Sequence, residues 1–220
     1  NEEKYLESID LADAVIKNNT DVSDKFFKKA SESAFLLDEF DKSIEYLKKA
    51  ISINDNKEYR ENWDKIVRMR KDIEIALKMY TEEGNFDDSI NEFQKLKKDY
   101  PDCALVDYNL GRIYQQEENY NKALENFQIA VKLNPYREKY ELSLNYIIGR
   151  FINEGDEYYS MRDFDSAIDK YLFAYEYMND NSVLIFKIAK TYYFLKEYIE
   201  SRKMLEDLVQ VDSLHYEGYK

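Results

Sequence analysis

The chain contains very little glycine and proline, with five glycines and two prolines in 220 residues. Turn-rich β-sandwiches and barrels use both residues at most of their loops, so this scarcity favours long helices. No apolar run approaches the ~20 residues that a membrane-spanning helix needs. Residues 1–20 are acidic and amphipathic, unlike a signal peptide. A cytoplasmic location is favoured, and export or a periplasmic location stays open because a segment before Asn1 could have been trimmed.

Reactive side chains are also scarce, since Cys103 is the lone cysteine and His215 the lone histidine. A single cysteine cannot form an internal disulfide, and we expect Cys103 to be a small buried hydrophobe. One histidine argues against zinc sites built on His and Cys, and against histidine-activated nucleophiles. The sequence has no HExxH, paired CxxC, GxSxG or phosphate-binding glycine loop. We therefore expect no catalysis, no cofactor and no bound metal.

Positive charge is in deficit, with 32 Lys and Arg against 45 Asp and Glu and a formal net charge of −13. Nucleic-acid affinity depends on neutralising phosphates, so we expect no nucleic-acid partner. The lack of long apolar runs likewise predicts no membrane insertion. Hydrophobic residues make up 44% of the chain, which is typical of a globular protein.

What the chain does contain is a repeat. Pro101 and Pro135 lie 34 residues apart, and each ends an apolar-patterned segment. Aligning the two segments places Ser89 over Ala123 and Phe93 over Phe127, and it places Leu77 over Gly111. The pattern of small and aromatic positions recurs along the chain. A fixed period of this kind predicts stacked helical hairpins, in which two helices approach closely where side chains are small.

The stretch "LGRIYQQEENYNKALENFQIAVKLNP" carries a family resemblance. Eight of its residues fit consensus positions of the tetratricopeptide repeat family: Leu110, Gly111, Tyr114, Tyr120, Ala123, Phe127, Ala130 and Pro135. Asp107 departs from the pattern, because the family has an aromatic residue there. The resemblance implies an all-α fold, a right-handed α-solenoid of stacked helical hairpins.

The repeats divide the chain into a single solenoid over residues 1–220. We expect a half repeat at 1–19, repeats at 24–56, 57–101, 102–135 and 136–181, and a last repeat at 182–220. Ser43 to Ser89 spans 46 residues and Ala123 to Ala167 spans 44, both longer than the period. About 11 extra residues make three helical turns and keep the buried face in register. We therefore expect elongated first helices in the repeats at 57–101 and 136–181.

Two explanations of the elongated helices stay open. They are either the result of a duplication without functional meaning, or they form an apolar surface for self-association through Trp63 and Tyr140. Tyr59 and Tyr136 would belong to the same surface.

The resemblance also implies a concave groove lined by the first helices of the repeats, where family members hold peptides. At the lining positions the chain has eight basic residues (Lys25, Lys28, Lys29, Lys71, Lys78, Arg112, Lys187 and Lys190) and four acidic ones (Glu32, Glu74, Glu82 and Asp156). The surplus of four positive charges leaves −17 for the rest of the chain. A basic concavity in an acidic body would attract acidic ligands, although chance placement of lysines on solvated helix faces would give the same count.

The ligand-binding residues expected in the groove are Lys78, Tyr108, Asn109, Arg112, Asn153, Lys187 and Lys190. By resemblance, Asn109 and Asn153 would hold the ligand backbone through their amides. The clamp that family members use for chaperone C-terminal carboxylates is not reproduced, because Leu105, Gly149 and Val183 stand where lysine would be needed.

These patterns favour a non-catalytic protein–protein interaction scaffold that binds an acidic extended or helical peptide segment in the groove. Two alternatives are a structural subunit that self-associates through the elongated helices, giving a homo-oligomer, and an accessory domain cut from a larger protein. Binding that ignored charge would instead indicate an apolar site around Tyr159 and Tyr193.

Overall fold

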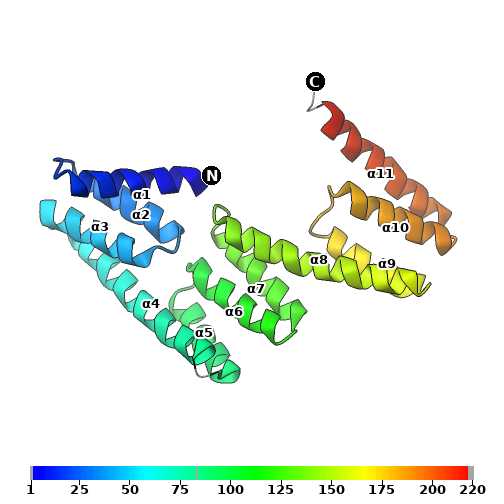
Figure 1. Cartoon of the computed structure of the whole chain (residues 1–220), viewed down its shortest axis with the longest axis horizontal. Helices are drawn as coiled ribbons and strands as arrows, with labels where there is room; N and C mark the ends of the chain where they lie inside the picture. Colours follow the sequence, from blue (N-terminus) through cyan, green and yellow to red (C-terminus); the bar gives the residue numbers. More distant parts are fainter. Residues whose placement is uncertain (1, 83, 218–220) are drawn as a thin grey trace. The chain divides into compact units, whose positions relative to one another are not determined.

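The computed structural model describes residues 2–82 and 84–217, with side chains up to residue 211, so His215 lies outside the described side chains. All regular secondary structure in these ranges is α-helical, which confirms the predicted fold class (Figure 1). The helices are α1 (Glu2–Lys17), α2 (Asp24–Leu36), α3 (Phe40–Ile53), α4 (Lys57–Thr81), α5 (Phe86–Asp99), α6 (Ala104–Gln116), α7 (Tyr120–Leu133), α8 (Glu138–Ser160), α9 (Phe164–Tyr175), α10 (Ser182–Phe194) and α11 (Tyr198–Glu217). In the described part of the chain, no helix combines the length and the apolar character that crossing a membrane requires.

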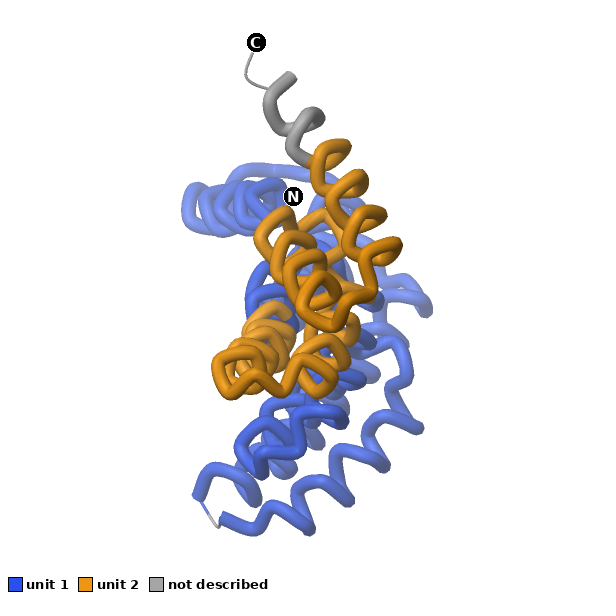
Figure 2. The backbone as a smooth tube through the Cα atoms, turned by 90° about the vertical axis from the view of Figure 1, so that its right-hand side faces the viewer, with its two compact units in different colours: residues 1–144 blue, residues 145–220 orange. Residues whose placement is uncertain are grey.

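The chain forms two compact units, residues 1–144 and residues 145–220 (Figure 2). Unit 1 contains α1 to α7 and the start of α8, and unit 2 contains the rest of α8 with α9, α10 and α11. The boundary falls inside the long helix α8. Each unit is described by itself below.

Small residues mark the contacts between paired helices, as the repeat pattern predicts. A Cβ atom added to Gly111 in α6 would lie 2.7 Å from the ring of Phe127 in α7. A Cβ atom on Gly155 in α8 would lie 2.6 Å from the ring of Tyr171 in α9. Both distances are shorter than any real contact, so the aromatic ring of the second helix occupies the space that glycine leaves free.

Where serine replaces alanine at the second small position, its hydroxyl group binds the backbone of the first helix. Ser89 Oγ donates to Ala76 O at 2.9 Å, and Ser201 Oγ donates to Ala189 O at 2.8 Å. The first of these bonds corrects the alignment given above. Ala76, not Leu77, takes the place of Gly111, because the turn between α4 and α5 is one residue longer than the turns of the other hairpins.

The hairpin turns share one backbone feature, a residue with positive φ just after the first helix. These residues are Asp38, Gly84, Glu118, Arg162 and Lys196. The next residue then bonds back to the helix: Asn119 N–H reaches Tyr114 O at 2.8 Å, and Glu197 N–H reaches Tyr192 O at 2.9 Å. This left-handed cap satisfies carbonyl groups that the helix end would otherwise leave unpaired. Glycine adopts such a conformation most easily, yet only Gly84 is a glycine among the five.

Both elongated helices are continuous. Helix α4 has 25 residues and α8 has 23, whereas α2, α6 and α10 have 13 each. Helix α8 passes through Gly149 without a break, and a Cβ atom added there would meet nothing within 4 Å. The prediction of two long first helices is therefore confirmed.

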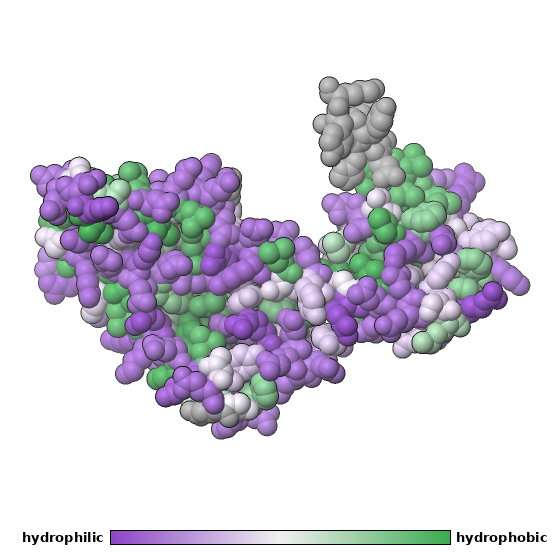
Figure 3. Space-filling view, viewed as in Figure 1, coloured by the Kyte–Doolittle hydropathy of each residue, from purple (hydrophilic) through white to green (hydrophobic). Residues whose placement is uncertain are grey.

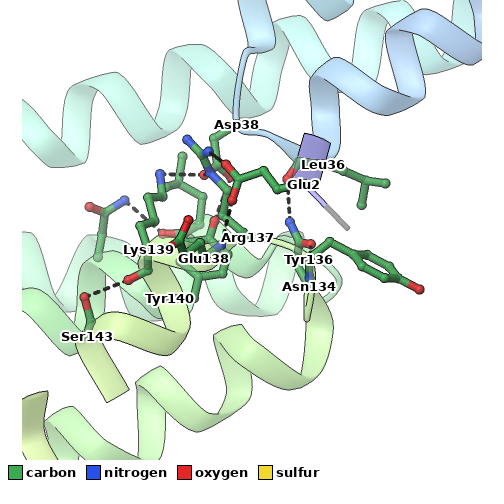
Figure 4. A network of polar contacts seen from close by, with 12 residues as sticks. Glu2, Leu36, Asp38, Asn134, Tyr136, Arg137, Glu138, Lys139, Tyr140 and Ser143 are labelled. Carbon is green, nitrogen blue, oxygen red and sulfur yellow. Dashed lines mark hydrogen bonds and ion pairs between the residues drawn. The ribbon is translucent and has the colours of Figure 1, made fainter. Parts of the chain in front are cut away.

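Unit 1 contains a polar cluster that joins distant parts of its chain (Figure 4). Asp38, in the α2–α3 turn, accepts hydrogen bonds from Tyr140 OH at 2.7 Å and from Arg137 Nε at 3.3 Å. Lys139 Nζ lies 2.6 Å from the same carboxylate. Arg137 also pairs with Glu2 at the start of α1. The N-terminal hairpin of unit 1 is thus held against the α7–α8 junction, about 100 residues later in the sequence.

This cluster overturns the expected role of Tyr140. Its side chain is 0% exposed, and burial raises the pKa of its hydroxyl group far above the usual range. A fully buried ring cannot contact a second copy of the chain. Tyr59 is also buried and its hydroxyl group donates to Asp24 at 2.9 Å. Tyr140 and Tyr59 therefore cannot belong to the surface expected from Trp63, Tyr140, Tyr59 and Tyr136, whereas Tyr136 is 46% exposed.

Candidate protein-binding surfaces

Unit 1 contains a recess between α2, α3 and α4, with a volume of about 460 Å³. Five apolar residues form its floor: Phe35, Leu36, Leu47, Ile66 and Met69. Its rim is polar and consists of Lys28, Glu32, Asn62 and Lys65, and the buried Ser31 also lines the recess. In Figure 3, hydrophobic residues come to the surface of unit 1 among hydrophilic ones. An apolar floor with a polar rim is the usual composition of a ligand pocket, and such pockets span roughly 300–1,000 Å³.

The two lysines of the rim differ in their surroundings. Lys28 Nζ donates to Glu58 at 2.7 Å and lies 3.7 Å from Glu32. The hydrogen bond with Glu58 raises the pKa of Lys28, so this cation is already neutralised locally. Lys65, on α4, is exposed and forms no ion pair within the described part of the chain. Lys65 is therefore the cation of the rim without an ion-pair partner among the described residues.

The expected groove residues of unit 1 have unequal positions. Arg112 is exposed and its guanidinium lies 5.9 Å from the ring of Tyr108. Tyr108 is half-buried and packs 4.8 Å from the ring of Tyr140. Lys78 is exposed and lies 3.7 Å from Glu82. Asn109 is only 2% exposed, and its Nδ2 donates to the backbone of its own helix at 2.9 Å, so its amide is used internally.

In unit 2, the expected groove residues lie on α8 and α10. Asn153 is exposed on α8. Lys187 on α10 forms an ion pair with Asp156 on α8, and Asp156 also accepts a hydrogen bond from Tyr171 OH at 2.6 Å. Burial, together with this hydrogen bond, raises the pKa of Tyr171 far above the usual range. Lys187 is therefore occupied by a partner within unit 2.

Lys190 has a different environment. Its ammonium group lies 5.3 Å from the ring of Tyr159 and 5.7 Å from the ring of Phe186, both favourable cation–π contacts. In the part of the chain that the structure describes, these rings are its neighbours and it forms no ion pair. Of the seven residues expected to bind a ligand, Arg112 and Lys190 are thus the exposed cations that rest on rings and lack an acidic partner.

A buried ion pair in unit 1 was not expected from the sequence. Asp107, on α6, is 1% exposed, and Lys97 of α5 forms an ion pair with its carboxylate. Lys97 Nζ also lies 3.3 Å from Asn126 Oδ1. Burial raises the pKa of Asp107. The signal in the sequence was the missing aromatic residue at this position, since the site where the family buries a ring remains buried here.

The lone cysteine is buried in unit 1. Cys103 is 4% exposed, and burial raises the pKa of its thiol to about 12, so the thiol stays protonated at neutral pH. The expectation of a buried, hydrophobic cysteine is confirmed. Within residues 2–82 and 84–211 there is no group of three or more His, Cys, Asp and Glu side chains that could hold a metal ion.

Two segments of the chain match models described as tetratricopeptide repeats, residues 29–57 and residues 108–137. The matches cover most of α2 and all of α3, and most of α6 and all of α7. No curated protein sequence gives a significant match.

Several solved structures are similar to the chain. A crystal structure of MamA is 18% identical and the match covers 85% of this chain and 96% of that chain, with a TM-score of 0.32. The P58(IPK) TPR domain is 16% identical over 79% of this chain and 47% of that chain, with a TM-score of 0.41. The TPR2AB domain of yeast Sti1 in complex with pHSP90 is 14% identical over 86% of this chain and 78% of that chain, with a TM-score of 0.31.

Proposed function

We propose that the chain, two segments of which match tetratricopeptide repeat models, is a non-catalytic protein-interaction scaffold that binds an acidic segment of a partner. Protein–protein interaction is the general role of such repeats. The finer part of the proposal concerns the partner, which would be an extended or helical segment with negative charge beside apolar side chains.

The observation that carries this proposal is the recess of unit 1. Its apolar floor, which includes Ile66 and Met69, lies beside the exposed Lys65 on the same helix. Apolar side chains of a partner would gain free energy by leaving water for this floor. An acidic side chain next to them would pair with Lys65. The chain has a net charge of −13, so most of its surface would repel an acidic segment, and pairing is expected only beside exposed cations such as Lys65.

Arg112 is a second exposed cation of unit 1 that could pair with the acidic segment. It lies exposed on α6, which like α2 and α4 is a first helix of its hairpin. A guanidinium that rests on a tyrosine ring is held in a narrow range of positions, so it loses less freedom on pairing with a carboxylate. We propose Lys65 and Arg112 as the cations of unit 1 that recognise the partner.

The alternative of a self-associating subunit has lost much of its support, because Tyr140 is buried. Trp63 remains half-buried with Lys48 5.8 Å from its ring, which is weak support for an interface on its own.

The proposal is tested by affinity capture with the full chain, identification of the bound segment, and measurement of its Kd by titration calorimetry. Lys65→Glu should weaken binding at least tenfold, because it replaces attraction with repulsion. The control is Lys57→Glu on the same helix, which changes the net charge equally and lies outside the recess. Rising salt should weaken the wild-type complex. Equal losses in the two variants, or binding that ignores salt, would contradict an acidic ligand in this recess.

A further inference from the structure

Unit 2 ends in an exposed apolar face formed by α10 and α11 (Figure 3). Its large hydrophobic side chains include Val183, Phe186, Tyr193, Tyr198, Leu205 and Val209, which are 41% to 67% exposed. Soluble proteins seldom leave so many apolar side chains together at the surface without a partner. The repeat inside unit 2 indicates what kind of partner this face fits.

The preceding hairpin shows how such a face is covered. Helix α10 packs against α9, and its Phe194 stacks on Phe164 with ring centroids 5.0 Å apart and an angle of 11°. Phe194 also meets Tyr159 at 5.9 Å. Lys187 of α10 lies over the ring of Tyr171 at 5.8 Å, and Tyr171 is only 1% exposed. In this hairpin, the following first helix thus covers the aromatic face.

The uncovered face repeats these positions 34 residues later. The residues that follow Tyr159, Phe164 and Tyr171 by this distance are, in order, Tyr193, Tyr198 and Leu205. They are 59%, 58% and 41% exposed. The rings of Tyr193 and Tyr198 still meet each other, at 5.6 Å, and form a preassembled aromatic edge. Within the residues that the structure describes, the end of unit 2 is therefore a repeat-stacking face without a covering helix.

Charge distinguishes this face from the one before it. In the covered hairpin, Asp156 pairs with Lys187 of the covering helix. The residue 34 positions after Asp156 is Lys190, so the sign at this position is reversed. A helix that covers the end of unit 2 needs an acidic residue where α10 has Lys187.

We propose that the α10–α11 face binds an amphipathic helix from a partner protein, seated as a further first helix, with an acidic residue that pairs with Lys190. This surface belongs to unit 2, whereas the recess described above belongs to unit 1. A second copy of α10 fits it poorly, because its Lys187 would face Lys190 and like charges at close range destabilise a complex.

The chain supplies the probe for a test. A fluorescently labelled, terminally capped peptide with the sequence of residues 182–195 represents a covering helix, and a second peptide carries Lys187→Glu. Both are titrated with the full chain, and binding is measured by fluorescence anisotropy. The acidic peptide should bind at least tenfold more tightly than the unchanged peptide. Lys190→Glu in the protein should reverse this preference, whereas the control Lys98→Glu, an exposed residue of unit 1, should leave it unchanged.

The position of binding is checked with Leu205→Arg and Val209→Arg, whose side chains are 41% and 67% exposed, so both variants should keep the circular dichroism spectrum of the wild type. Each variant should lower the affinity for the acidic peptide at least tenfold. Equal affinity for the two peptides, no binding of either, or a preference that survives Lys190→Glu would overturn the proposal. A wild-type dimer in sedimentation that Val209→Arg dissociates would also overturn it, because the occupant would then be a second copy.

Discussion

Tyr140 donates a hydrogen bond of 2.7 Å to Asp38, a residue 102 positions earlier in the chain. Both side chains are shielded, with Tyr140 0% exposed and the side chain of Asp38 9% exposed. The carboxylate is compensated there by Arg137 and Lys139. A buried carboxylate is tolerated when it is paired and hydrogen-bonded, whereas loss of one partner lowers the free energy of unfolding.

Removing the hydroxyl group of Tyr140 tests this contact. Tyr140→Phe keeps the ring and should lower the free energy of unfolding by about 1–2 kcal/mol, because Asp38 loses a buried donor. Urea unfolding followed by circular dichroism measures the change. Tyr136→Phe, at an exposed tyrosine of the same junction, is the control and should have little effect. Equal stability of Tyr140→Phe and wild type would show that water replaces the hydroxyl group easily.

The buried Asp107 predicts an unusual dependence on pH. Burial raises the pKa of Asp107, so the folded state binds a proton more readily than the unfolded state. The contribution of Asp107 to the free energy of unfolding therefore falls as the pH rises from 3.8 through the pKa of the folded state. Asp107→Leu should therefore stabilise the protein at pH 7 by about 1–2 kcal/mol, since Lys97 is 35% exposed and can turn to water. The gain should shrink toward pH 4, as protonation removes the cost of the charge in the wild type.

The comparison variant removes the cation of the Lys97–Asp107 ion pair instead of the carboxylate. Lys97→Met leaves the carboxylate buried without a cation and should destabilise the protein at pH 7 by about 3 kcal/mol. Chemical unfolding of both variants at several pH values supplies the comparison. A destabilised Asp107→Leu at pH 7 would mean that the ion pair contributes more than its desolvation costs.

Replacing glycine by alanine should change stability in opposite directions at Gly111, which lies at a helix contact, and at Gly149, which does not. Gly111→Ala should destabilise unit 1 by about 1–3 kcal/mol, because the new methyl group meets Phe127 at 2.7 Å. Gly149→Ala, in α8, meets nothing within 4 Å and should stabilise its helix by about 0.5–1 kcal/mol. Thermal unfolding distinguishes the two. Tolerance of alanine at Gly111 would mean that the hairpin can open without loss.

The left-handed turn residues make a further prediction. Glu118 has φ of 58°, and Glu118→Gly should stabilise the protein by about 0.5–1 kcal/mol by relieving the conformation. Gly84, with φ of 62° and open space around its Cβ position, gives the reciprocal change, and Gly84→Ala should destabilise by a similar amount. Unfolding by urea checks both, and changes of the same sign would contradict the argument.

The helical architecture follows from the sequence because the repeat is local. Gly111 and Phe127 lie within one period, so a pattern of small and large residues is enough to place their contact. The alignment of Leu77 with Gly111 was wrong for an equally local reason, because one extra residue in the α4–α5 turn shifts the register of α4. The hydrogen bond from Ser89 to Ala76 reveals this shift.

The candidate surfaces were less predictable, because they depend on contacts between repeats. Helical periodicity placed Lys187 on an accessible face but could not show that Asp156 neutralises it. The hydroxyl group of Tyr140 bonds to Asp38, a residue 102 positions away and outside any repeat-length window, so the repeat pattern could not reveal this contact. Lys65 was missed because it lies outside the positions that line the groove in the family.

The junction between Glu2, Asp38 and Arg137 changes how unit 1 should come apart. In an open array each repeat touches its neighbours alone, so the ends fray first and the middle persists. In unit 1 the first helix is bonded to the start of α8, where Glu138 N–H donates to Glu2 at 2.9 Å. The first turn of α1 is therefore held in place by residues at the start of α8, and α1 should not unfold alone. Its amide hydrogens should exchange only when the distant α7–α8 junction also opens, in one cooperative event.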